Sequence, residues 1–71
     1  MINPLRERLA AIEHDQWMHW ARSILDTEHI SPARAERWRT LMVPYDDLTE
    51  HQKDADREWA DRVLECIKER I

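Results

Sequence analysis

The chain has 71 residues and a formal net charge of −4, and 37% of its residues are charged, with both signs interspersed. This length allows a single domain over residues 1–71, close to the lower limit at which one core folds without a disulfide, a metal or a partner. The sequence shows no basic stripe, so DNA or RNA is not an expected partner. It has no run of ~18–20 apolar residues that could span a membrane. With one cysteine, it can form neither an internal disulfide nor a thiolate zinc site.

The first helix is predicted from Pro4 to about Asp26, because Asn3 suits the N-cap and Pro4 the first helical position. Its apolar side chains fall into two adjoining stripes. The first stripe contains Leu5, Leu9, Ile12, Trp20 and Ile24, and the second contains Ala10, His14, Trp17, Ala21 and Leu25. Since one stripe is enough for a helix that leans on one neighbour, we expect burial against two surfaces, one of them on another subunit.

A short second helix is predicted from about Pro32 to Thr40, with Ser31 as its N-cap and with Ala35 and Trp38 facing inward.

A turn is predicted before the last helix. Val43 precedes Pro44 and is therefore held in an extended conformation. Tyr45–Asp47 then forms the turn, in which the aspartates can bond the local backbone.

The last helix is predicted to begin with a capping box formed by Thr49 and Gln52 and to run to about Arg70. One face carries the apolar side chains of Ala55, Trp59, Val63, Cys66 and Ile67, and we expect Cys66 to be a buried, unreactive thiol. The fold class is therefore a small all-α domain of two long helices and one short helix, with an extended Val-Pro-Tyr turn before the last helix.

Four of the five aromatic residues are tryptophans. Trp17, Trp20, Trp38 and Trp59 lie at helical spacing, which is first of all typical of a core. Four tryptophans are nevertheless many for one core of this size, and partly exposed tryptophans can stack on a base or contact a partner.

Two motifs resemble the ryanodine receptor repeat, or RyR domain. His14–Trp17 resembles the His-x-x-Trp element of that domain. Val43–Leu48, followed by Gln52–Lys53 and Asp56, resembles its second signature, roughly Val-Pro-Tyr-Asp-Glu-Leu, a basic residue and an aspartate that opens the last helix. The resemblance covers about Leu9 to Val63.

The chain departs from the family between the two motifs. Family members carry Gly-Trp-x-Tyr-Gly after the first helix and a His-Pro pair before the second signature. Residues 24–42 read ILDTEHISPARAERWRTLM, without glycine and with Arg39-Thr40 in place of the His-Pro pair. We therefore expect a rebuilt site in which Trp38 replaces the missing tryptophan.

The resemblance implies binding by paired copies. In ryanodine receptors the repeat occurs in tandem pairs, and paired copies look able to hold an adenine nucleotide between them, with the His-x-x-Trp tryptophans near the base. Small phage and bacterial proteins carry similar single copies, which could recreate the pair only as a homodimer.

A ligand site is predicted from these motifs and from the residue types. Its residues are Trp17, Trp38, Tyr45, Asp46, Arg39 and Lys53. The indoles would stack on a base, Tyr45 and Asp46 would bond ribose hydroxyls or an amine, and Arg39 and Lys53 would meet a phosphate. The same residues also fit core packing, turn chemistry and ordinary surface charges.

A structural polar cluster is predicted at His14, Tyr45 and Asp56. His14 lies inside an apolar stripe, and Asp56 lies at the edge of the apolar face of the last helix. Buried polar groups are nearly always paired, so we expect a neutral imidazole bonded to Tyr45, to Asp56 or to a backbone carbonyl.

The sequence offers no catalytic arrangement. His14 and His19 do not share a helix face, Cys66 has no nearby histidine, and a chain without glycine has no glycine-rich phosphate loop. We therefore expect no enzyme activity, no cofactor and no metal.

Two functions stay open. The first is binding of a nucleotide or nucleotide-derived signal by a cytoplasmic homodimer, since the N-terminus has no signal-peptide pattern and the lone cysteine suits a reducing compartment. The second is a protein–protein interaction module. A concave aromatic surface with cations at its rim would favour the first, and a flat apolar surface the second.

Overall fold

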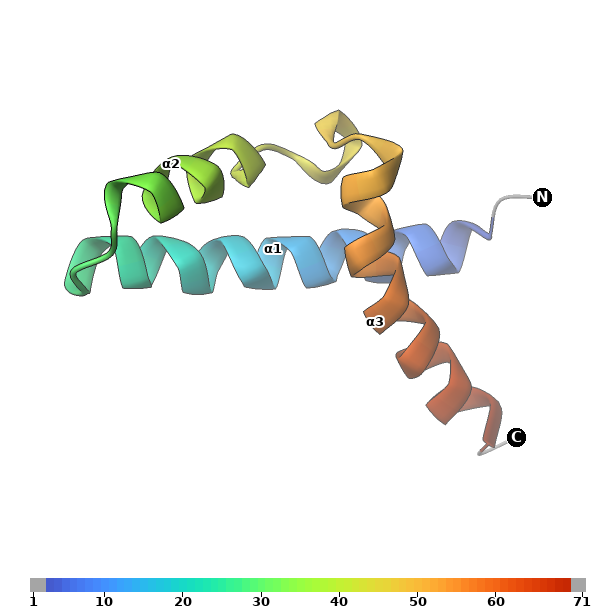
Figure 1. Ribbon diagram of the computed structural model, residues 1–71. Helices are drawn as coiled ribbons and strands as arrows, with labels where there is room; N and C mark the ends of the chain where they lie inside the picture. The colour runs from blue at the N-terminus through green and yellow to red at the C-terminus, as the bar shows by residue number, and fades with distance from the viewer. Residues whose placement is uncertain (1–2, 70–71) are drawn as a thin grey trace.

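The computed structural model describes residues 3–69, which form three α-helices and one turn of 3₁₀ helix, with no strand in this range (Figure 1). The helices are α1 (Pro4–Thr27), α2 (Pro32–Leu41) and α3 (Glu50–Glu69), and the 3₁₀ turn η1 (Tyr45–Asp47) precedes α3. The predicted all-α class, with two long helices and one short helix, is confirmed. The predicted end of the last helix at Arg70 lies outside the described residues.

The first two helices begin at the predicted caps. The side-chain oxygen of Asn3 accepts hydrogen bonds from the backbone N–H groups of Leu5 and Arg6, at 3.0 and 3.3 Å. The Ser31 hydroxyl accepts one from the N–H of Arg34 at 3.3 Å. These bonds satisfy donors that a helix N-terminus leaves free.

The predicted capping box starts α3. The Thr49 N–H donates to the Gln52 side chain at 2.9 Å, and the Gln52 N–H donates to the Thr49 hydroxyl at 3.1 Å. The direction of α3 is thus fixed at its first turn, directly after η1.

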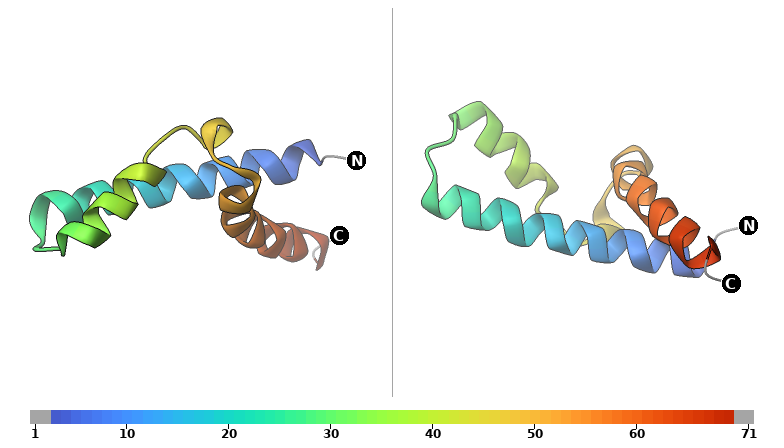
Figure 2. Two further views of the ribbon diagram at one scale, coloured as in Figure 1. Left: turned by 45° about the horizontal axis from the view of Figure 1, so that its top comes forward. Right: turned by 90° about the horizontal axis from the view of Figure 1, so that it is seen from below.

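The longest helix, α1, runs along most of the molecule, and the other two helices pack on it. In Figures 1 and 2, α2 turns back along the C-terminal half of α1, and α3 crosses α1 and then projects away from it. The molecule measures 45 × 24 × 14 Å, so it is long and thin.

The core is small and lies where α1, η1 and α3 meet. Ala10 on α1 and Ala60 on α3 have no exposed surface, and Tyr45 and Leu48 belong to the same buried cluster. Small alanine side chains allow two helices to approach closely at a crossing. No large side chain of residues 3–69 is completely buried.

The apolar face predicted for the last helix lies largely outside this core. Trp59 is 50% exposed and Val63 37% exposed, and Cys66 and Ile67 are also exposed. The expectation of a core Trp59 and a buried Cys66 is therefore wrong. The physical reason is that α3 projects away from α1 after the crossing (Figure 1). Ala60 and Asp61 still contact α1, Asp61 through an ion pair with Arg6. The side that carries Trp59, Val63 and Ile67 is left exposed.

On α1 the second of the two predicted stripes is the better buried. Ala10, His14 and Ala21 are buried. In the first stripe Leu5 and Ile12 are exposed and Trp20 is 54% exposed, so the expectation of a core Trp20 is also wrong. One apolar stripe of α1 thus packs against the rest of the chain, and much of the other stripe is exposed. No helix of the described residues is long and apolar enough to cross a membrane.

Candidate functional site

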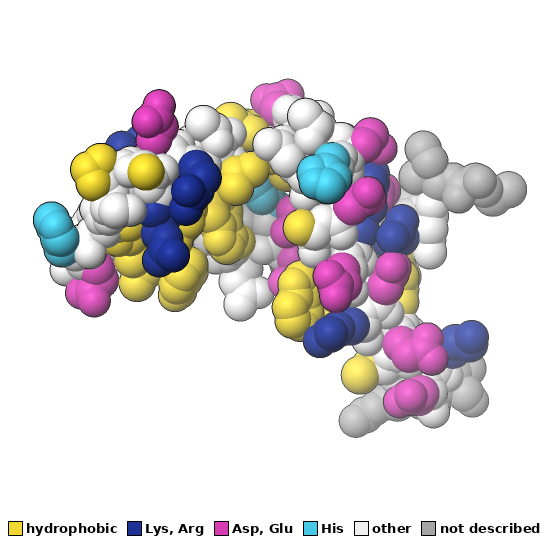
Figure 3. All heavy atoms as spheres, in the orientation of Figure 1, with side chains coloured by type: hydrophobic (Ala, Val, Ile, Leu, Met, Phe, Trp, Pro, Cys, Tyr) yellow, Lys and Arg dark blue, Asp and Glu magenta, His cyan; other side chains and the backbone are white. Residues whose placement is uncertain are grey.

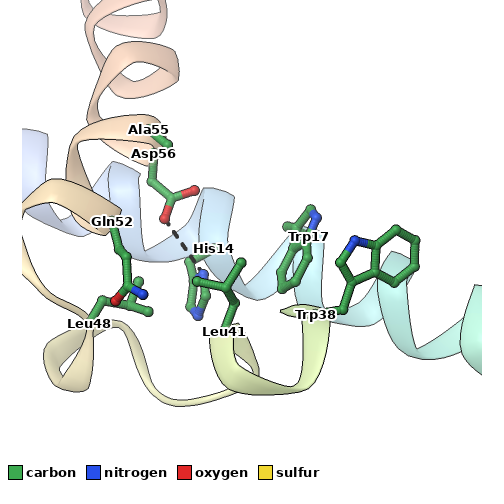
Figure 4. A pocket seen from close by; sticks show the side chains of 8 residues that line it. All are labelled: His14, Trp17, Trp38, Leu41, Leu48, Gln52, Ala55 and Asp56. Atoms are coloured by element: carbon green, nitrogen blue, oxygen red, sulfur yellow. Dashed lines mark ion pairs between the residues drawn. The ribbon is translucent and has the colours of Figure 1, made fainter. Parts of the chain in front are cut away.

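His14 links α1 to two other segments. The imidazole is only 4% exposed, and its Nε2 lies 2.7 Å from the carbonyl oxygen of Val43. Because a carbonyl only accepts, Nε2 carries the proton and donates it. The other ring nitrogen, Nδ1, lies 3.5 Å from the carboxylate of Asp56 on α3 (Figure 4).

Asp56 sits in a partly desolvated position. Burial raises the pKa of its carboxyl group, the nearby His14 opposes this rise, and the charge of Glu13 adds to it. Desolvation penalises the charged form of an acid, so an N–H donor that bonds to this carboxyl group would favour its ionised form.

Tyr45 has a partner that sequence reasoning missed. Its hydroxyl donates to Glu7 at 3.1 Å. The Glu7 carboxylate also accepts from Arg57, at 2.9 Å from Nε and 2.6 Å from Nη2. The signal was present, because Glu7 precedes His14 by two helical turns and therefore shares its buried side of α1.

The hydrogen bonds of Glu7 also change the pKa values of the groups that form them. The hydrogen bond from Arg57 is the main cause that lowers the pKa of Glu7. Burial, followed by the bond to Glu7, raises the pKa of Tyr45 to about 12. Tyr45 is thus a core side chain whose hydroxyl serves the fold.

An inner pocket of about 280 Å³ lies between α1, α2 and the start of α3 (Figure 4). Its apolar lining is Trp17, Trp38, Leu41, Leu48 and Ala55, and its polar lining is His14, Gln52 and Asp56. The Trp17 and Trp38 rings meet edge to face, with 6.1 Å between centroids and 76° between planes. The Trp17 ring lies nearly parallel to the His14 ring, at 18° and 6.0 Å.

An outer pocket of about 400 Å³ lies on the other side of Trp17, between α1 and α3. Its lining is Glu13, Gln16, Trp17, Trp20, Ala55, Asp56 and Trp59. Three residues, Trp17, Ala55 and Asp56, line both pockets. We call the two pockets together the aromatic cleft.

Only part of the predicted ligand set reaches this cleft. Trp17 and Trp38 line it, and so do His14 and Asp56 of the predicted polar cluster. Tyr45, Asp46, Arg39 and Lys53 line neither pocket.

The structure places the predicted polar and cationic ligand residues elsewhere. Lys53 lies over the Tyr45 ring, 5.3 Å from its centroid, and 3.4 Å from Glu50. Arg39 and Asp46 are exposed. Neither pocket is lined by Lys or Arg, and the charged groups of the cleft are the carboxylates of Glu13 and Asp56. The lining of the cleft therefore offers no binding group for phosphate, and Arg62, over the Trp59 ring, lies at its edge.

Within residues 3–69, no three His, Cys, Asp or Glu side chains lie close enough to hold a metal ion. Comparison with known proteins found no matching family model, no matching curated protein and no matching solved structure. The resemblance to the RyR domain accordingly stays a prediction from the two motifs.

Proposed function

We propose that the chain is a non-catalytic domain that binds a small molecule with a flat, nitrogen-containing ring in the aromatic cleft, and that it acts as a homodimer. The observation that carries this proposal is the inner pocket, where two indoles and a desolvated carboxylate border one hollow. Binding sites for small molecules are mostly apolar hollows with a few placed polar groups, and the inner pocket has this character.

The lining favours a ring over a phosphate. Indole faces and edges stack with a nucleobase, and Asp56 can accept a hydrogen bond from a ring N–H or an amino group. A volume of about 280 Å³ is just below the ~300–1,000 Å³ of pockets for drug-sized ligands, which suits a single ring system. The base of a nucleotide or of a nucleotide-derived signal fits this description, with its phosphates outside the pocket.

Two predictions complete the proposal. The motif resemblance to the RyR domain supports a nucleotide-like ligand, because paired copies in that family look able to hold an adenine nucleotide. A cytoplasmic location is part of the proposal, because the lone thiol suits a reducing compartment.

A thermal-shift screen with adenine, adenosine and AMP tests the proposal, since a ligand that binds only the folded chain raises its melting temperature. We expect adenosine to raise the melting temperature and Trp38→Leu to weaken its binding about tenfold or more, because one base stacked on an aromatic ring contributes roughly 1–3 kcal/mol. Lys53→Ala is the matched control, since Lys53 lies outside the cleft, and it should leave adenosine binding unchanged.

The second candidate function is a protein–protein interaction module. The exposed apolar face of α3, with Trp59, Val63 and Ile67, favours it, because large apolar patches on a surface mark interaction sites. A folded chain that responds to no member of the nucleotide panel would contradict the ring-binding proposal and leave this candidate.

A further inference from the structure

The aromatic cleft continues into an uncovered face of α3. Trp59 lines the outer pocket, and Val63 and Ile67 follow it by one and two helical turns, so they lie on the same side of the helix. All three are exposed, and Cys66 beside them is exposed as well. We call Trp59, Val63, Cys66 and Ile67 the α3 apolar face. Figure 3 shows apolar side chains on the part formed by α1 and α2 and on α3, with a hollow between the two groups.

The chain exposes far more surface than a monomer of its mass. Its accessible surface is 5862 Å² for 8.7 kDa, whereas folded monomers of this mass expose about 4,700 Å². The radius of gyration is 14.1 Å, against about 11 Å for a compact domain of this length. About 1,100 Å² of surface is thus in excess.

The excess is larger than the area that each partner buries in a standard dimer interface. A standard protein–protein interface covers about 800 Å² on each partner. The buried cluster of Ala10, Tyr45, Leu48 and Ala60 is small for a domain of this length. A second copy would therefore supply the burial that this chain cannot provide for itself.

Charge also favours a second copy over an unrelated partner. The cleft is lined by the carboxylates of Glu13 and Asp56. The α3 apolar face carries a cation at its edge, because the Arg62 guanidinium lies over the Trp59 ring, 4.5 Å from its centroid. Its contact with Glu58 is 3.9 Å long and both side chains are about two-thirds exposed, so Arg62 is free to meet another carboxylate or a phosphate.

We propose that a second copy of this chain covers the α3 apolar face, with the α3 of each copy packed against the outer pocket of the other, so that the inner pocket stays open to the ring. A hollow and a projecting helix on the same chain allow such a reciprocal, closed pair. The arrangement covers the outer pocket and brings Arg62 of the partner subunit to a cleft whose lining has no cation. This last point rests on the proposed ring-binding function, and the dimer itself does not.

The first test measures molar mass by light scattering after gel filtration of the full chain and two variants. We expect a dimer for the wild type and a monomer for Val63→Glu, which places a charge in the α3 apolar face. The matched control is Ile12→Glu, because Ile12 is 60% exposed on α1 and lines neither pocket. It should remain a dimer. Circular dichroism verifies that both variants are helical.

Cys66 provides a second, independent measurement. Its thiol is exposed in the single chain and would be covered in the pair. We expect a disulfide reagent such as dithionitrobenzoate to react several-fold more slowly with the wild type than with Val63→Glu. A monomeric wild type, equal thiol reactivity in both proteins, or a dimer that Ile12→Glu dissociates and Val63→Glu does not, would each overturn the proposed interface.

The contribution of the partner is tested with AMP and adenosine on Arg62→Gln and on the Val63→Glu monomer, which keeps its own Arg62 and has no partner. We expect Arg62→Gln to remain a dimer, to bind adenosine like the wild type and to bind AMP at least several-fold more weakly, and we expect the Val63→Glu monomer to show the same loss of AMP relative to adenosine. Equal loss for both ligands, or no loss for either, overturns the role of Arg62. A Val63→Glu monomer that keeps the wild-type ratio of AMP affinity to adenosine affinity overturns the contribution of the partner and leaves ring binding intact. A wild-type dimer that binds neither ligand refutes ring binding and leaves the interface intact.

Discussion

The carboxylate of Glu7 accepts hydrogen bonds from Tyr45 and Arg57, which follow it by 38 and 50 positions in the sequence. Both donors favour the ionised carboxylate, and the bond from Arg57 is the largest cause of the lowered pKa of Glu7. Charge-assisted bonds of this kind are stronger than neutral ones. A single side chain on α1 thus fastens both η1 and α3 to the first helix.

The lowered pKa predicts how stability depends on pH. A carboxyl group whose folded pKa is depressed contributes stability above its ordinary value, which is 4.5 here, and this contribution is lost as pH falls through the folded pKa. We expect Glu7→Gln to lower the melting temperature at neutral pH and to differ much less from the wild type in strong acid. Melting curves across this range measure the difference. A difference in melting temperature between Glu7→Gln and the wild type that stays constant with pH would contradict the lowered pKa of Glu7.

Residue-level prediction succeeded where the cause is local and failed where it is not. The caps at Asn3 and Ser31 and the capping box at Thr49 depend on neighbours within three positions, so the sequence alone reveals them. The partners of Glu7 are distant in sequence and depend on how α3 crosses α1. For the same reason Lys53, counted among the ligand residues by its type, lies over the Tyr45 ring outside the cleft.

At the level of the elements, a histidine joins three segments. His14 on α1 donates to the Val43 carbonyl before η1 and faces Asp56 on α3. The motif with Val43, Pro44 and Tyr45 is therefore a turn held against the helices by buried polar groups. The sequence predicted Tyr45, Asp56 or a backbone carbonyl as the partner of His14; the last two lie beside its ring, whereas Tyr45 donates to Glu7 instead. The direction of α3 beyond the crossing depends on contacts that no periodicity reveals.

Removal of Asp56 tests this link between the elements. We expect Asp56→Ala to destabilise the fold by about 1–3 kcal/mol, because it removes the carboxyl group 3.5 Å from Nδ1 of a buried imidazole, a contact in which a proton on one of the two groups joins them. Asp56→Asn should cost less, since an amide still offers a hydrogen-bonding group and carries no desolvated charge. Glu58→Ala is the matched control, because Glu58 is exposed and forms only a long ion pair. Urea denaturation measures all three, and unchanged stability in Asp56→Ala would refute the link.

For the whole molecule, the structure shows whether the four tryptophans form one core. The sequence showed four tryptophans and no disulfide, which favours either a tryptophan-rich core or an oligomer. Trp20 and Trp59 are 54% and 50% exposed, and no large side chain of residues 3–69 is completely buried, so these two rings do not form a core within one chain. Their half-exposed rings instead face the cleft between α1 and α3.

If a second copy completes the fold, stability must depend on concentration. Dimerisation stabilises the folded state by mass action, so the melting temperature of the wild type should rise by several degrees over a hundredfold increase in protein concentration. Val63→Glu should melt at a lower temperature that does not change with concentration, whereas Ile12→Glu should behave like the wild type. Differential scanning fluorimetry over a dilution series measures these slopes. A wild-type melting temperature that is the same at every concentration would show that the thin chain folds alone, and that its apolar surface has another purpose.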